Sequence, residues 1–137
     1  HGPGKLVGYP IINLRKHGIG VKKYVETLEV SIINTLKYFN ILAYQIEGLT
    51  GIWVGEESEV KRKIGAIGIR VRNGVSMHGF ALNVTTDLSY FNHIVPCGIA
   101  NKEVTSIYQE TGSGSVTEFA LAFQNTFQTE WQKALAL

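Results

Sequence analysis

The dipeptide Asn73-Gly74 and the apolar runs on either side of it place the strongest limit on the fold. Residues 63–71 and 76–85 are rich in Ile, Val, Ala and Leu. Asn-Gly favours positive φ at both central positions of a two-residue turn, and the twist of such a turn matches two antiparallel strands. The sequence therefore predicts a β-hairpin over these residues and an antiparallel sheet around it.

Three glycines interrupt this hairpin. Gly65 and Gly68 lie in the first run, and Gly79 lies in the second. Glycine weakens a strand interior, and it often marks a position where a ligand or another backbone comes close. We expect a groove in which a slim apolar ligand lies against the backbone. The alternative is that these glycines only relieve packing between strands.

Apolar periodicity predicts two helices. In residues 21–39 the apolar positions recur in steps of three and four, as in one face of an amphipathic helix, at Val21, Val25, Leu28, Ile32, Leu36 and Phe39. Ser115 and Glu118 form a capping box that begins a second helix. Its aromatic stripe is expected in the core and consists of Phe119, Phe123, Phe127 and Trp131. The predicted fold class is α+β, with a mostly antiparallel sheet and helices packed on one side.

Shorter segments complete the prediction. A buried strand with Pro10 at an edge or bend is expected over 6–14, and short strands are expected around 41–46 and 52–54. The polar run 56–62 is typical of an exposed loop. Asn101 is expected to cap a short helix that ends at Gln109.

The length, charge and cysteine count narrow the class of protein. A chain of 137 residues is expected to form one domain over 1–137. No apolar run approaches the length that crosses a bilayer, and a net charge of +2 is too small to indicate nucleic-acid binding. A single cysteine excludes an internal disulfide and is typical of a reducing compartment such as the cytoplasm.

The sequence contains no motif for a metal or a nucleotide. Its four histidines and one cysteine do not have the spacing of zinc ligands. Neither Gly-x-x-x-x-Gly-Lys-Ser/Thr nor Gly-x-Gly-x-x-Gly is present. We therefore expect a protein that uses no metal and no other cofactor.

The thiol of Cys97 and the amine of Lys63 are candidate catalytic groups. Cys97 lies in Pro96-Cys97-Gly98-Ile99, where glycine leaves the backbone open to an incoming carbonyl group and nearby N–H groups could stabilise an oxyanion. Lys63 begins the first strand of the hairpin, and an ammonium group near a thiol favours the thiolate. Such a pair suits acyl transfer. The alternatives are a cysteine that only packs and a lysine that only keeps a strand end solvated.

Positive charge is concentrated in one part of the sequence. The cluster consists of Lys61, Arg62, Lys63, Arg70 and Arg72. It is either a solvated strand edge or a docking patch for an acidic partner.

Five segments of this chain occur in a characteristic order and at characteristic separations. They are 1–10, 48–54, 63–70, 78–84 and 94–99, and the last two carry His78-Gly79-Phe80-Ala81-Leu82-Asn83 and Pro96-Cys97-Gly98-Ile99. In these segments the chain resembles the lipoyl(octanoyl) transferases over essentially its whole length. The resemblance implies the fold of the biotin and lipoate protein ligases.

The resemblance also implies roles for individual residues. Cys97 is then the acyl-carrying nucleophile and Lys63 is the partner that tunes it. An acyl-binding tunnel is implied along Ala66, Ile67, Gly68, Gly79, Phe80 and Ala81. His1 is implied to be the last residue of a substrate-binding stretch, Arg-Gly-Gly-x-x-Thr-Tyr-His, and further supporting candidates are His78, Asn83 and Gly98.

The implied reaction moves an octanoyl group and needs neither nucleotide nor cofactor. The donor is octanoyl-acyl carrier protein, and the acyl group passes through a cysteine thioester. The acceptor is the lysine of a lipoyl domain, in the E2 subunits of 2-oxoacid dehydrogenases or the glycine cleavage H protein. This is the first step of endogenous protein lipoylation, and the implied compartment is the cytoplasm, or a mitochondrion or plastid in a eukaryote.

At its start the chain departs from the family pattern. The residues that precede His1 in the substrate-binding stretch are absent, together with the first strands and helix, so an N-terminally truncated domain is expected. Lys5 stands in place of a glutamine, and Asn73-Gly74 in place of Arg-Trp. Two alternatives remain open: an ATP-dependent lipoate ligase-like enzyme, and a non-catalytic remnant that binds carrier protein or a lipoyl domain.

Overall fold

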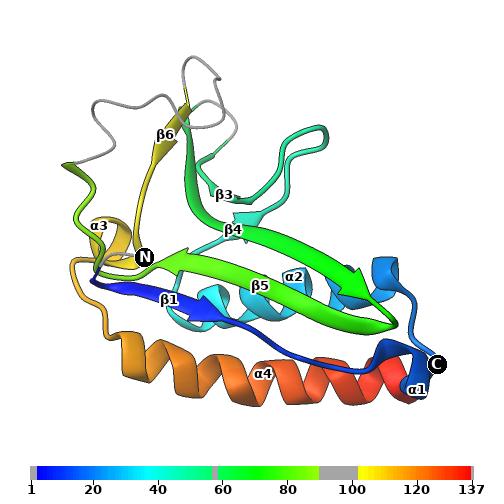
Figure 1. Cartoon of the computed structure of the whole chain (residues 1–137). Coiled ribbons are helices and arrows are strands. Elements are labelled where there is room, and N and C mark those ends of the chain that lie inside the picture. Colours follow the sequence, from blue (N-terminus) through cyan, green and yellow to red (C-terminus); the bar gives the residue numbers. More distant parts are fainter. Residues whose placement is uncertain (1–2, 57–58, 90–101, 137) are drawn as a thin grey trace.

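In the part of the chain that the structure describes, a six-stranded sheet packs against two long helices, and two short helices complete the fold (Figure 1). The computed structural model describes residues 3–56, 59–89 and 102–136. In chain order the elements are β1 (Lys5–Gly8), α1 (Leu14–His17), α2 (Val21–Tyr38), β2 (Ala43–Tyr44), β3 (Ile52–Val54), β4 (Lys61–Arg72), β5 (Val75–Asn83), β6 (Lys102–Val104), α3 (Ile107–Thr111) and α4 (Val116–Ala136). The antiparallel strand order is β1-β5-β4-β3-β2, and β6 pairs in parallel with β4. The predicted α+β class is confirmed.

The β4–β5 hairpin is the longest pairing in the sheet. Its strands pair from Arg72 and Val75 at the turn to Gly65 and Leu82. Both turn residues have positive φ, 52° at Asn73 and 80° at Gly74, as a type I′ turn requires. The hairpin predicted from Asn-Gly is therefore confirmed, and each strand begins one or two residues earlier than the sequence predicted.

Helices α2 and α4 pack against one face of the sheet and against each other. Helix α2 spans 21–38, close to the predicted 21–39, although Val21 at its start is exposed. Helix α4 begins after Ser115, whose Oγ accepts the backbone N–H of Glu118 at 3.2 Å. The core between helices and sheet includes Leu28, Ile32, Leu36, Ile52, Ile64, Phe80, Leu82, Phe119 and Phe123. The predicted helices are confirmed, and so is the core role of Phe119, Phe123 and Phe127, whereas Trp131 is half-buried and stacks on Phe127 outside the core cluster.

The predicted strand over 6–14 is wrong beyond Gly8. Pro10 has no N–H to donate to a ladder, and the chain after β1 is held by side chains instead. Ser76 Oγ accepts the N–H of Ile12 at 2.8 Å and donates to the carbonyl oxygen of Pro10 at 2.8 Å. Asn13 then caps helix α1 by accepting the N–H of Lys16.

The predicted helix from Asn101 to Gln109 is also wrong. Residues 102–104 form strand β6, because they pair with residues 61–63 of β4. Helix α3 begins only after Ser106, whose Oγ accepts the N–H of Gln109 at 3.0 Å, and it continues to Thr111. The expected loop over 56–62 is shorter than predicted, since β4 already begins at Lys61, and the strand around 41–46 is reduced to Ala43–Tyr44.

Within residues 3–56, 59–89 and 102–136, neither long helix is apolar enough to cross a bilayer. Within the same ranges no group of three or more His, Cys, Asp or Glu side chains could hold a metal ion.

Candidate active site

An open apolar groove of about 510 Å³ lies on strands β1, β4 and β5. Its lining consists of Val7, Tyr9, Ala66, Gly68, Ile69, Gly79, Phe80 and Ala81. Ala66 pairs with Ala81 and Gly68 pairs with Gly79 across the hairpin, so two successive pairs on one face of the sheet carry almost no side chain. Small residues at these positions leave a trough on the sheet face that the helices do not cover. A trough of this chemistry suits an alkyl chain.

Five of the six residues expected to line an acyl tunnel do line this groove: Ala66, Gly68, Gly79, Phe80 and Ala81. Ile67 is the exception. It is partly buried and packs against the core on the helix side of the sheet. The physical reason is that successive side chains of a strand point to opposite faces. The ring of Phe80, which pairs with Ile67, is likewise buried in the core, although Phe80 borders the groove.

The two groove glycines differ in their surroundings. A Cβ added to Gly68 would meet no heavy atom within 4 Å. A Cβ added to Gly79 would lie 1.8 Å from the carbonyl oxygen of Gly8 in strand β1. Gly79 is therefore required by the close approach of β1, whereas Gly68 leaves open space in the groove.

A register shift in strand β4 brings Lys63 to the groove face. Trp53 of β3 pairs with Lys63, but the preceding residue, Ile52, pairs with Gly65, so Ile64 is an extra residue in β4. Such a bulge reverses the alternation of side chains along one strand. Lys63 therefore shares a face with Ala66 and Gly68, which simple alternation would have placed on the opposite face.

The side chain of Lys63 is half-buried between β4 and the turn before β3. Its Nζ lies 5.9 Å from the centroid of the Trp53 ring. A Cβ on Gly51 would lie 2.5 Å from Lys63 Cε, and Gly51 has a φ of 114°. Any side chain at position 51 would therefore clash with the aliphatic part of Lys63, and glycine avoids this clash.

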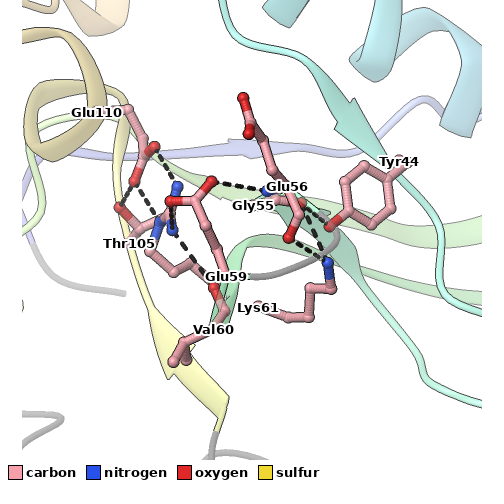
Figure 2. A network of polar contacts seen from close by, with 9 residues as sticks. Tyr44, Gly55, Glu56, Glu59, Val60, Lys61, Thr105 and Glu110 are labelled. Carbon is pink, nitrogen blue, oxygen red and sulfur yellow. Dashed lines mark hydrogen bonds and ion pairs between the residues drawn. The ribbon is translucent and has the colours of Figure 1, made fainter.

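A polar network lies next to Lys63 and joins β4 to α3 (Figure 2). Arg62 donates from Nε and Nη2 to the two carboxylate oxygens of Glu110, each at 2.9 Å. Thr105 Oγ1 donates to Glu110 Oε2 at 2.6 Å. Burial alone raises the pKa of Glu110, but the hydrogen bonds and positive charge around it prevail, so its pKa lies below the ordinary value. The hydrogen bond to Glu110 raises the pKa of Arg62 in turn.

Two residues of the predicted basic cluster, Lys61 and Arg62, therefore make contacts within the domain. Besides the ion pair of Arg62, Lys61 Nζ donates to the carbonyl oxygens of Gly55 and Glu56 at 3.3 and 2.6 Å. Tyr44 donates its hydroxyl to the same Gly55 oxygen (Figure 2). Arg70 and Arg72 lie farther along β4 and are exposed.

The remaining predicted site residues divide into two groups. His1, Cys97 and Gly98 lie outside the described residues. Asn83, predicted as a supporting residue, is buried and donates from Nδ2 to the carbonyl oxygen of Thr105 at 3.0 Å. His78 lies on β5 and pairs with Ile69.

Comparison with protein families identifies the domain. A family model described as the lipoyl protein ligase A/B catalytic domain matches residues 1–128. The chain belongs to this family.

Relatives of the lipoyl protein ligase A/B domain include several octanoyltransferases. The chain is 54% identical to an octanoyltransferase of Cytophaga hutchinsonii over 111 residues, which are 80% of this chain and 46% of the relative. It is 51% identical to a mitochondrial octanoyltransferase of Arabidopsis thaliana over 112 residues, 81% of this chain and 46% of the relative. The chain thus spans about half the length of these relatives.

Solved structures confirm the predicted fold of the biotin and lipoate protein ligases. A biotin protein ligase from Aquifex aeolicus matches with a TM-score of 0.72 at 16% identity, covering 97% of this chain and 55% of the other. A bi-partite lipoate protein ligase from Thermoplasma acidophilum matches with a TM-score of 0.68 at 18% identity, covering 96% of this chain and 53% of the other.

Sequence reasoning missed Glu110 and Thr105 of this lipoyl protein ligase A/B domain. Thr105 lies in the segment that was expected to be one helix from Asn101 to Gln109, and Glu110 follows directly after it. The Ser106 cap is the signal that could have found the true helix start, since Ser is a preferred N-cap residue. Nothing local to the sequence indicated that Thr105 and Glu110 contact the neighbours of Lys63.

Proposed function

We propose that this chain is the acyl-binding and catalytic part of an octanoyltransferase. The groove supports the proposal, because an apolar trough between small residues suits an unbranched acyl chain. Relatives about half identical to the chain, and named octanoyltransferases, support the same assignment. The observation that carries it is the shared face: Lys63 lies on the sheet face that holds the groove.

In the proposed first step the thiolate of Cys97 attacks the carbonyl carbon of an octanoyl thioester on acyl carrier protein. A new C–S bond forms, the carrier's C–S bond breaks, and the carrier thiol leaves with a proton from the ammonium group of Lys63, which becomes a neutral amine. One thioester replaces another, so the step is nearly isoenergetic and needs no nucleotide. The ammonium group of Lys63 stabilises the thiolate before the attack. Backbone N–H groups near Gly98 stabilise the oxyanion.

In the second step the amine of a lipoyl-domain lysine attacks the Cys97 thioester. The N–C bond forms, the C–S bond breaks, and the amine loses a proton to Lys63 acting as general base. The product is an amide, which makes this step downhill. Acceptors of this kind are the lipoyl domains of E2 subunits and the glycine cleavage H protein.

The exposed Arg70 and Arg72 support docking of an acidic carrier protein, since they lie on the strand that forms the groove. A steering role for these residues depends on ionic strength. For a bacterial source the cytoplasm is the proposed compartment, and the Arabidopsis relative is mitochondrial by its name.

An ATP-dependent ligase is the second candidate function, because the family model also covers lipoyl protein ligases and the matched solved structures are ligases. The test is incubation of the chain with octanoyl-acyl carrier protein, followed by intact mass measurement. We expect an octanoyl adduct without ATP in the unmodified chain and no adduct in Cys97→Ala. Acylation from free acid that requires ATP would instead establish the ligase, and the absence of any adduct would establish a non-catalytic binding domain.

A further inference from the structure

The backbone of Lys63 is held by the residue that follows strand β6. Thr105 donates its N–H to the carbonyl oxygen of Lys63 at 2.9 Å, continuing the parallel pairing in which Lys63 lies opposite Val104. Main-chain contacts of this kind fix where a strand lies along its length. The position of Lys63 relative to the groove therefore depends on where Thr105 lies.

Thr105 is itself fully buried and held through three groups. Its N–H contacts Lys63 on β4, its carbonyl oxygen accepts from Asn83 on β5 at 3.0 Å, and its hydroxyl donates to Glu110 on α3 at 2.6 Å. A buried residue with all of its polar groups bonded has little freedom to shift. Asn83, predicted as a supporting residue, acts in this network through Thr105.

The carboxylate of Glu110 completes a closed ring of contacts that runs from the backbone of Lys63 through Arg62, Glu110 and Thr105. It binds Arg62, the residue next to Lys63 in the chain, through two parallel hydrogen bonds at 2.9 Å. It also accepts the hydroxyl proton of Thr105, which holds Lys63 from the neighbouring strand. A bidentate arginine–carboxylate pair fixes direction as well as distance. Glu110 thus restrains Arg62 and Thr105, the two neighbours of Lys63, at once. Figure 2 shows its contact with Thr105.

The ring lies on the far side of the sheet from the groove. Arg62 precedes Lys63 in β4, so its side chain points to the opposite face, where it lines a cavity together with Glu110 and Tyr44. On the groove side, Lys63 is confined by Gly51 and Trp53. Glu110 therefore does not reach the groove side, where the proposed reaction takes place.

We propose that Glu110 is a positioning residue for Lys63, acting through Arg62 and Thr105. This inference rests on the proposed function, in which Lys63 is the charge partner and the proton acceptor. A displacement of a catalytic group by about 1 Å can reduce the rate by about 100-fold. Loss of the carboxylate is therefore expected to reduce acyl transfer although no substrate touches it.

The test compares variants that alter the contacts of Glu110 or of Thr105. Glu110→Gln weakens the pair with Arg62, Thr105→Val removes only the hydroxyl group, and Thr105→Ser restores it. The matched control is Glu130→Gln, which breaks the helix α4 ion pair of Glu130 with Lys133 at 3.1 Å, far from the groove. The isosteric valine variant keeps the test decisive even where the glutamine variant fails to fold.

Two measurements are made on each folded variant. The first is the single-turnover rate of octanoyl transfer from the acylated chain to a lipoyl domain. The second is residue-resolved acetylation by an N-hydroxysuccinimide ester, read by peptide mass spectrometry as the rate at Lys63 relative to exposed Lys22. The second measurement does not depend on octanoyl transfer, so it separates failure of the positioning role from failure of the proposed function.

For Glu110→Gln and Thr105→Val we expect the rate of octanoyl transfer to fall by about tenfold to 100-fold. The relative acetylation rate of Lys63 should rise by roughly threefold or more, because the local restraint on Lys63 is lost. Thr105→Ser and Glu130→Gln are expected to match the unmodified chain in both. Unchanged Lys63 acetylation in the first two variants would overturn the positioning role, whatever happens to transfer. Equal behaviour of Thr105→Val and Thr105→Ser would overturn it as well. Altered acetylation in a chain that forms no acyl adduct would support positioning and reject the proposed function.

Discussion

Gly68 and Gly79 pair across the β4–β5 hairpin, yet their missing side chains have different physical reasons. The carbonyl oxygen of Gly8 occupies the place of a side chain at position 79, whereas position 68 faces open space in the groove. From the sequence both glycines were expected to admit a ligand or to relieve packing. The structure assigns packing to Gly79 and open groove to Gly68.

Substitution at these two positions is expected to have opposite outcomes. Gly79→Ala should lower the free energy of unfolding by about 1–3 kcal/mol, because strand β1 must move away from the new methyl group. Gly68→Val should leave stability close to that of the unmodified chain and shift acceptance from octanoyl and decanoyl donors toward hexanoyl. Thermal melts and acylation rates with the three donors test this. A uniform loss across all chain lengths in folded Gly68→Val would contradict the groove.

Replacement of Lys63 should separate its two proposed roles. Lys63→Arg keeps the positive charge but cannot accept a proton near neutral pH. The acyl-enzyme should therefore form and accumulate, whereas Lys63→Ala should lose both thiolate stabilisation and transfer. An iodoacetamide pH titration of Cys97 and single-turnover transfer measure the two roles. Identical behaviour of the two variants in both assays would argue against the dual role.

At the scale of elements, short helix α3 carries Glu110, and its position depends on one N-cap. Ser106 caps α3, and Ser115 caps the long helix α4 in the same way. The two serines therefore offer a matched pair of substitutions. One substitution removes the cap of the helix that carries Glu110, and the other removes the cap of a helix that does not contact Lys63 through this network.

Each cap substitution is expected to reduce stability to a similar extent but only one to affect transfer. Ser106→Ala and Ser115→Ala should each lower the free energy of unfolding by about 1 kcal/mol. Only Ser106→Ala should slow octanoyl transfer, because it loosens the first turn of the helix that holds Glu110. Urea denaturation and single-turnover transfer are the measurements. Equal transfer rates in the two variants would show that α3 has no effect on Lys63.

At the scale of the whole molecule, the two faces of the sheet have different functions. The helices cover one face and bury the core, while the other face carries the groove and Lys63. The polar network of Glu110 connects strand β4 and Thr105, the residue that follows β6, with helix α3 on the side of the sheet away from the groove. The stability of the domain should therefore depend on the charge of Glu110.

Acid is expected to destabilise the domain through this carboxylate. The folded pKa of Glu110 lies below its ordinary value of 4.5, so its contribution to stability is complete above that value. The contribution disappears as the pH falls through the lower folded pKa. Urea unfolding between pH 6 and about pH 3 should show the difference in unfolding free energy between the unmodified chain and Glu110→Gln shrinking as the pH falls. A constant difference across this range would contradict a stabilising role for the charged form.

The sequence by itself determined the elements whose causes are local. Asn73-Gly74 specified the hairpin because its residues accept positive φ, and apolar periodicity specified α2 and α4. Cross-strand placement of the small residues also followed from this hairpin, so most of the groove could be predicted once the family resemblance pointed to it. Residues 102–104 could not be predicted, since a helix and a strand were both acceptable locally until β4 supplied a pairing partner.

Only the tertiary structure decided which groups meet. The register shift at Ile64 moved Lys63 to the groove face, and strand alternation then left Ile67 on the core side. Glu110 meets Arg62 from a position 48 residues away. Contacts of this kind depend on pairing register and on packing between distant segments, and neither is encoded in the preferences of neighbouring residues.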